Sequence, residues 1–137
     1  MKKVKLLMTT MAMTMFIALS FSASAQTDRV VVTNNTACDM TVAIVGSSQL
    51  SPCSNDYGEG MAVVPANSTA TVFFYDRGVA VTTFFTGAGA METDNNGVPQ
   101  GLGASHDQCT TTLIPGSGPT CSSFYVTITG QASMTIN

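Results

Sequence analysis

The run Ser68-Thr-Ala-Thr-Val-Phe-Phe-Tyr75 is followed by Asp76-Arg-Gly78 and then by a second run, Val79-Ala-Val-Thr-Thr-Phe-Phe-Thr86. Both runs are rich in β-branched and aromatic residues, and the segment between them ends in glycine, which is a strong strand–turn–strand signal. The pattern predicts a β-hairpin with a two-residue Arg77-Gly78 loop. The pairs on one face of this hairpin would be Phe74 with Val81, Val72 with Thr83, and Ala70 with Phe85.

The second face of this hairpin carries aromatic residues as well. Adjacent residues of a strand point to opposite faces, so Phe73, Tyr75 and Phe84 should lie on the side away from Phe74. Either a second sheet or a loop covers these rings, as in ordinary sandwich cores, or they form an apolar patch for a partner. We therefore take Phe73, Tyr75 and Phe84 as candidate interaction residues, together with Tyr57 from an earlier loop.

The rest of the chain predicts more short strands separated by turn residues. Residues 38–45 alternate, and so do residues 121–129. The side chains expected to face inward from these two segments are Cys38, Met40, Val42, Ile44, Phe124, Val126 and Ile128. Further strands are expected at 29–34, 61–64, 90–93, 109–114 and 132–136, and loops at 46–60 and 98–108. Four methionines, Met40, Met61, Met91 and Met134, are interpreted as core residues. About seven to nine short strands predict an all-β, antiparallel, immunoglobulin-like β-sandwich.

The N-terminus has the three parts of a secretory signal. Residues 1–5 are basic, residues 6–19 form an apolar run, and small residues at Ala23 and Ala25 suit cleavage after residue 25. We expect residues 1–25 to be a cleaved signal peptide and residues 26–137 to be a single domain. The predicted location is secreted, extracellular or at the cell surface, with the periplasm as an alternative, and without membrane insertion after cleavage.

The charge of residues 26–137 excludes one class of partner. All three lysines precede residue 6, so only Arg29 and Arg77 remain against eight acidic residues, a net charge of −6 (2 − 8). Such a chain cannot form the basic groove that nucleic acid requires.

Four cysteines follow the expected cleavage site: Cys38, Cys53, Cys109 and Cys121. An even number in an exported chain predicts two disulfides. Three connectivities are open, and the sequence-local pairs Cys38–Cys53 and Cys109–Cys121 are favoured because each brackets one loop rich in Ser, Pro or Gly. The spacing lacks the close Cys-x2-Cys pairs of a zinc site.

Three segments offer polar chemistry. Glu92, Asp94 and Asn96, followed by Gly97, match the first half of a calcium loop, although a simple Asn-Gly turn explains the same residues. Asp56, Tyr57 and Glu59 crowd one loop and could hydrogen-bond a glycan, with the segment 92–106 beside them. His106 could serve a small hydrolase, but consecutive Ser105, His106 and Asp107 cannot form a catalytic relay among themselves. No cofactor other than this candidate calcium ion is expected.

These observations favour a non-catalytic extracellular protein that acts in surface assembly or protein–protein interaction. Its partner would be another copy of the chain or a cell-surface protein. In surface or fibre subunits of this kind, a strand from another chain can pair with an exposed edge strand. A small carbohydrate-binding or ligand-binding module is the alternative, and a small hydrolase is a third hypothesis.

Overall fold

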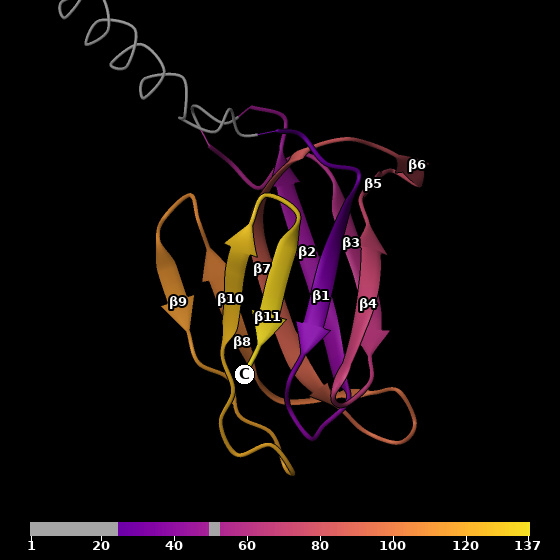
Figure 1. Cartoon of the computed structure of the whole chain (residues 1–137), viewed down its shortest axis with the longest axis vertical. Helices are drawn as coiled ribbons and strands as arrows, with labels where there is room; N and C mark the ends of the chain where they lie inside the picture. The colour runs from indigo at the N-terminus through magenta and orange to yellow at the C-terminus, as the bar shows by residue number, and fades with distance from the viewer. Residues whose placement is uncertain (1–24, 50–52) are drawn as a thin grey trace, which may run out of the picture.

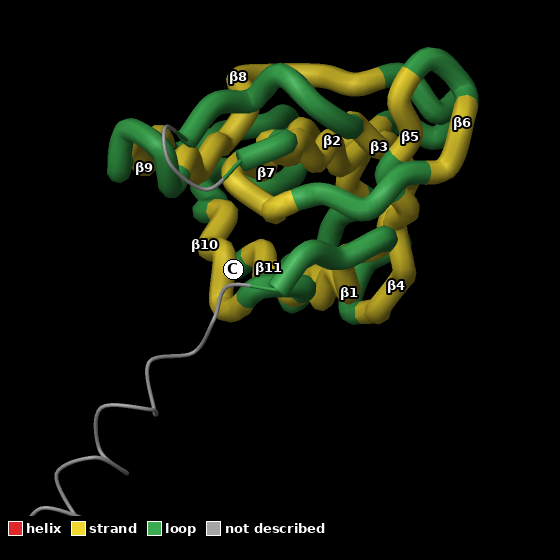
Figure 2. The backbone as a smooth tube through the Cα atoms, turned by 90° about the horizontal axis from the view of Figure 1, so that it is seen from above, coloured by secondary structure: helices red, strands yellow, loops and turns green. Residues whose placement is uncertain are grey.

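A computed structural model describes residues 25–49 and 53–137. These residues form two sheets and no helix, and the sheets lie in two layers when viewed along the strands (Figures 1 and 2). The four-stranded sheet has the order β10 (Val126–Gly130), β11 (Ser133–Ile136), β1 (Arg29–Asn34) and β4 (Ser68–Phe73). The seven-stranded sheet has the order β6 (Val79–Ala80), β5 (Tyr75–Asp76), β3 (Glu59–Val64), β2 (Met40–Ser47), β7 (Phe84–Thr93), β8 (Pro99–Asp107) and β9 (Thr112–Ile114).

The predicted all-β sandwich is therefore confirmed. The described part contains eleven strands, of which eight have four or more residues. The strands pair antiparallel with one exception, because β1 runs parallel to β11. The expected signal peptide falls almost entirely outside the described residues.

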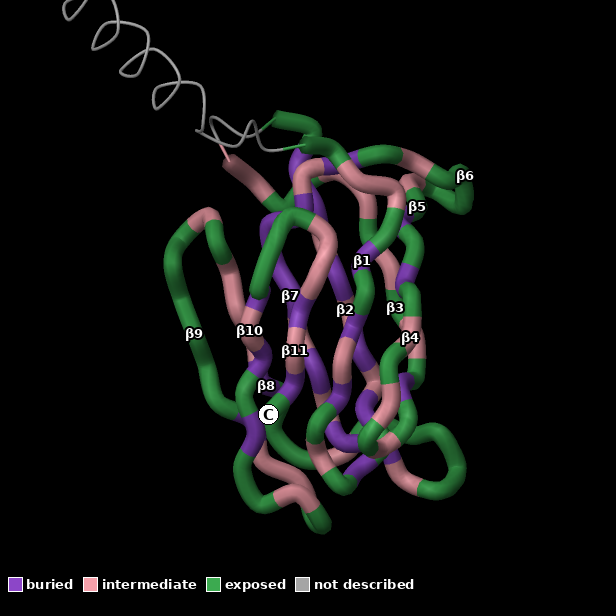
Figure 3. Tube along the Cα trace, viewed as in Figure 1, coloured by how far each residue is buried: buried purple, intermediate pink, exposed green. Residues whose placement is uncertain are grey.

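The core lies between the two layers. Buried residues alternate with exposed or half-buried ones along β1, and with half-buried ones along most of β2, where the sequence pattern predicts it (Figure 3). Phe74 and Phe124 are the largest side chains that are fully buried, and Phe74 packs against Phe85 with ring centroids 6.1 Å apart. The inward side chains expected from residues 38–45 and 121–129 are all buried.

A buried amide ties the two loops at one end of the sandwich together. Asn34 is fully buried, and its Nδ2 donates to the carbonyl oxygens of Cys38, Val64 and Pro65 at 2.8, 3.1 and 3.0 Å. Its Oδ1 accepts from the backbone N–H and the hydroxyl of Thr36. Because buried polar groups are costly unless paired, this network fixes the turn between β1 and β2 against the turn between β3 and β4.

The predicted long hairpin is wrong beyond its turn. Tyr75 pairs with Ala80 around a two-residue Arg77-Gly78 loop, and both loop residues have positive φ, as a type I′ turn requires. The N–H of Val81 also donates to the carbonyl of Phe74. Beyond this point the two runs separate, because the buried Phe74 marks the place where the chain crosses from one sheet to the other.

The separated runs pair with other strands. β4 pairs with β1, so Val72 lies opposite Val30 and Ala70 opposite Val32, while β7 pairs with β2 and β8. Most of residues 98–108, expected to be a loop, belong to β8 instead. Glycine, alanine and serine occupy much of β8, so its side chains show no alternation, and its backbone pairing with β7 defines the strand.

The favoured disulfide pairs are also wrong. The structure joins Cys38 to Cys121 and Cys53 to Cys109. Cys38 precedes β2 and Cys53 follows it, and an eight-residue strand separates its ends by about 27 Å, far beyond the reach of a disulfide. Cys38 meets Cys121 across the sandwich, whereas Cys53 meets Cys109 beside the seven-stranded sheet.

Candidate functional site

The outer face of the seven-stranded sheet is the most distinctive surface of the described structure. Its middle strand is β2, whose outward residues are Thr41, Ala43 and Val45, because the residues between them are buried. Strand pairing extends each of these positions into a row across the sheet. The rows are Val63–Thr41–Met91, Met61–Ala43–Gly89 and Glu59–Val45–Gly87, with β3 named first and β7 last.

The two strands beside β2 differ in side-chain size. β3 presents a ridge of long side chains, with Met61 72% and Val63 49% exposed. On β7 the matching positions include Gly89 and Gly87, which have no side chain to fill the space. A trough of about 360 Å³ lies over β7. It is lined mostly by apolar atoms of Thr41, Ala43, Met61, Gly89, Ala90, Met91, Pro99, Gly103, Ala104 and Ser105.

Two further depressions continue this trough along the face. One of about 290 Å³ shares Ala43 and Met61 with the trough and reaches Tyr75. The next, of about 320 Å³, is more polar. It is lined by Val45, Asn55, Asp56, Tyr57, Gly58, Glu59, Tyr75, Asp76 and Arg77. An apolar surface therefore ends in a polar hollow near β5.

Charge is sparse on the outer face. The outward positions of β3, β2, β7, β8 and β9 include two charged side chains, Glu59 and Asp107, and both lie in or beside the row that contains Val45. Because few charged groups would lose their hydration, covering this face with another apolar surface costs little desolvation free energy.

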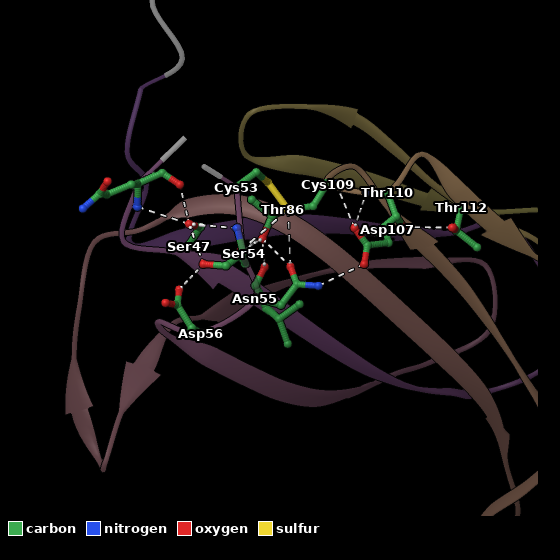
Figure 4. The surroundings of a disulfide bond; sticks show 12 residues. Ser47, Cys53, Ser54, Asn55, Asp56, Thr86, Asp107, Cys109, Thr110 and Thr112 are labelled. Atoms are coloured by element: carbon green, nitrogen blue, oxygen red, sulfur yellow. Dashed lines mark hydrogen bonds between the residues drawn. A yellow bond between two sulfur atoms is a disulfide. The ribbon is translucent and has the colours of Figure 1, made fainter. Parts of the chain in front are cut away.

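A hydrogen-bonded network holds the polar end of the face in place (Figure 4). The hydroxyl of Thr86 donates to Asn55 Oδ1 at 2.7 Å, and Asn55 Nδ2 donates to Asp107 Oδ2 at 3.0 Å. The other carboxylate oxygen of Asp107 accepts from the backbone N–H of Cys109 at 2.8 Å. The Cys53–Cys109 disulfide closes this network, so the loop that contains Tyr57 is attached to β7 and β8.

The structure brings together two of the four predicted interaction residues. Tyr57 and Tyr75 line the same polar hollow, with Asp56 and Glu59 beside them. Phe73 instead lies on the outer side of the four-stranded sheet, where the guanidinium of Arg29 sits 4.9 Å from its ring centroid. Phe84 is half-buried at the start of β7. The predicted aromatic residues therefore do not form one patch.

Sequence reasoning missed the residues that give the outer face its shape. Met40 and Met134 are buried as expected, but Met61 is the most exposed large apolar side chain described, and Met91 is half-exposed over the trough. The positions of certain residues along the sequence could have predicted this shape. Met61 should share a face with Val63 by alternation, and Gly87-Ala-Gly-Ala90 has glycine at alternate positions.

The candidate calcium residues are engaged elsewhere. Glu92 points inward, where its carboxylate accepts from the N–H groups of Cys121 at 2.8 Å and Thr120 at 3.1 Å. Burial raises its pKa, but these hydrogen bonds outweigh that effect and the pKa lies below its ordinary value. Asp94 accepts from the N–H groups of Val98 and Asn96, and these bonds lower its pKa.

Within the described part of the chain, one cluster holds three side chains of metal-binding type: Cys38, Glu92 and Cys121. Two of these three are joined to each other in a disulfide. Asp94 and Asn96 are outside the cluster.

His106 serves as a hydrogen-bond acceptor. Its Nδ1 accepts from the backbone N–H of Ile128 on β10 at 2.8 Å, across the edge of the sandwich. Ser105 and Asp107, its neighbours on β8, point to the opposite side of the sheet, as expected for consecutive strand residues.

Among the described residues, none belongs to a helix long and apolar enough to cross a membrane. Comparisons with protein-family models, with curated proteins and with solved structures gave no match.

Proposed function

We propose that this chain is a non-catalytic, exported protein that acts by binding another protein through the outer face of its seven-stranded sheet. The observation that carries the proposal is the shape and chemistry of that face. An exposed apolar ridge at Met61 and Val63 stands beside an apolar trough, and the charged side chains of the face gather toward the end that holds the polar hollow.

The core of the domain does not require this surface. The inward side chains of both sheets already bury each other, so Met61 and Val63 contribute little to the folding of a single copy. Large contiguous apolar patches on soluble proteins commonly mark interaction sites, and methionine is enriched where proteins meet. Binding of a partner would bury apolar surface that stays exposed in a single copy, and this burial would stabilise the complex.

The expected setting agrees with this role. Two disulfides are typical of proteins in oxidising compartments, and the N-terminal pattern favours export. A protein of this kind would act at the cell surface, outside the cell or in the periplasm. Its partner would be a second copy or another surface protein.

Methionine oxidation offers a direct test, because the domain contains its own controls. Met61 and Met91 lie on the outer face, whereas Met40 and Met134 are in the core. We expect hydrogen peroxide to convert Met61 to the sulfoxide at least fivefold more slowly in the exported protein on intact producing cells than in dilute purified protein. Met40 and Met134 should react slowly in both samples. Equal rates at Met61 in the two samples would contradict the proposal.

A specific observation supports a second candidate function. The polar hollow brings Tyr57, Asp56 and Glu59 together with Tyr75 and Arg77, a combination of aromatic faces and hydrogen-bonding groups that suits a sugar. Saturable binding on a glycan panel, lost in Tyr57→Ala but retained in Met61→Ala, would favour it. Loss in neither variant would exclude this hollow as the glycan site.

A further inference from the structure

We propose that the partner of the outer face is a second copy of the chain, packed face to face about a two-fold axis that runs along β2. This inference rests on the proposed function and identifies the partner. It follows from the register of three strands, which makes the face complementary to itself.

Each outward residue of β2 lies midway between a β3 residue and a β7 residue. Ala43 has Met61 on one side and Gly89 on the other, and Val45 has Glu59 and Gly87. A half-turn about an axis above β2 exchanges the two sides. The partner's Met61 then lies over Gly89, and Met61 lies over the partner's Gly89, so that both contacts form at once. Contacts of this reciprocal kind define a closed, isologous dimer.

The trough has room for the partner's Met61, which the two-fold axis places over Gly89. A Cβ placed on Gly89 would meet one atom within ordinary contact distance, the carbonyl oxygen of Ala104 at 3.5 Å. The trough extends to about 360 Å³, and methionine adapts readily to irregular space because its side chain is unbranched. In the neighbouring row, Val63 would lie over the partner's Met91, which extends the apolar contact along the ridge.

The same axis keeps Glu59 and Asp107 from lying over their own counterparts, and Arg77 lines the acidic hollow that Asp107 of the other copy would enter. Glu59 would lie over the partner's Gly87, which is uncharged. Asp107 and Tyr75 lie in the same row, each two strands from Val45 on opposite sides. The axis therefore sets Asp107 over the partner's Tyr75, where a hydroxyl donor meets a carboxylate acceptor.

The size of the face predicts a weak, reversible dimer. Five strands at about 4.8 Å spacing and about six residues of 3.3 Å each give a footprint of roughly 500 Å² per copy. The total of roughly 1,000 Å² is at the lower limit for specific interfaces. We therefore expect a dissociation constant in the micromolar range, with association evident only in concentrated or locally crowded protein.

Sedimentation velocity on the exported, oxidised protein between about 1 μM and 1 mM tests the dimer. The wild-type protein should dimerise as its concentration rises. Met61→Ala removes the ridge and Gly89→Met fills the trough, so each variant should weaken association at least tenfold. The double variant M61A/G89M reverses the large and small positions and should restore association to within about threefold of wild type. Such recovery isolates the pairwise contact.

A matched control lies on the other sheet. Val31 is 42% exposed on the outer side of β1, so Val31→Ser removes a comparable apolar side chain and should leave dimerisation unchanged. Thermal unfolding of all variants confirms that they are folded. A dimer unaffected by Met61→Ala and by Gly89→Met would overturn the proposed geometry.

The failure of this inference can be told apart from the failure of the proposed function. A protein that stays monomeric to 1 mM, yet has Met61 shielded from oxidation on the producing cell, would overturn the second copy as partner and leave the interaction surface intact. A monomer whose Met61 reacts equally in both settings would overturn both proposals.

Discussion

Glu92 is a buried acid whose role is to hold a loop. Its carboxylate accepts hydrogen bonds from the backbone of Thr120 and Cys121, next to the Cys38–Cys121 disulfide. Gly118 lies so close that an added Cβ would collide with the Glu92 side chain, 2.1 Å from Oε2. The carboxylate therefore organises the turn that leads into β10.

The pKa of Glu92 gives a pH-dependent prediction. Because its pKa in the folded protein is below its ordinary value of 4.5, the ionised carboxylate stabilises the fold above about pH 4.5, and this stabilisation is lost as the pH falls through the folded pKa. Glu92→Gln should therefore be less stable than wild type at pH 7, with the difference shrinking toward pH 3. Urea unfolding at several pH values measures this difference, and one that stays constant with pH would refute the assignment.

The sequence pattern predicted the buried side chains more accurately than the exposed ones. Alternation along 38–45 identified Met40, Val42 and Ile44 as core residues, because one buried face imposes period two. The same hydrophobicity misled at Met61, which is as apolar as Met40 but points to the opposite side of its sheet. Composition cannot separate an apolar residue that packs in the core from one that faces outward.

At the scale of strands, His106 protects an exposed edge. β10 ends the four-stranded sheet, and such an edge presents unpaired backbone groups. His106 Nδ1 accepts from the N–H of Ile128, and the carbonyl of Gly116 accepts from the N–H of Phe124. The register partners of His106 are Ala88 on β7 and Leu113 on β9, which are both apolar.

Replacing His106 tests this protection. His106→Phe keeps a ring but removes the acceptor, so the amide of Ile128 should exchange with solvent at least tenfold faster. His106→Asn offers an oxygen near the position of Nδ1 and should retain most of the protection. Hydrogen exchange measured by NMR reports the individual amide. Equal exchange in His106→Phe and wild type would show that the bond does not protect the edge.

The existence of most strands could be predicted, but their partners could not. The Arg77-Gly78 turn is local and was predicted correctly, whereas the strands that flank it belong to different sheets because Phe74 is buried at the crossing. β8 was missed, since Gly101 and Gly103 give it no side-chain pattern. Its position depends on pairing with β7, which neighbouring residues in the sequence do not encode.

The two disulfides perform different tasks. Cys38–Cys121 connects the seven-stranded sheet to the segment before β10, with Cys38 in the core. Cys53–Cys109 joins two loops at the polar end of the outer face. Their sequence separations of 83 and 56 residues correspond to chain-entropy contributions of about 4.5 and about 4.2 kcal/mol, so chain entropy barely distinguishes them.

Burial should distinguish the two bonds. Replacing Cys38 and Cys121 by alanine leaves a cavity in the core, whereas replacing Cys53 and Cys109 loosens half-exposed loops. We expect the first pair of substitutions to cost about 1–2 kcal/mol more than the second, measured by urea unfolding of both double variants. The second should instead loosen the loop that carries Tyr57, seen as faster amide exchange there. Equal stabilities in the two variants would mean that the core bond stabilises only by chain entropy.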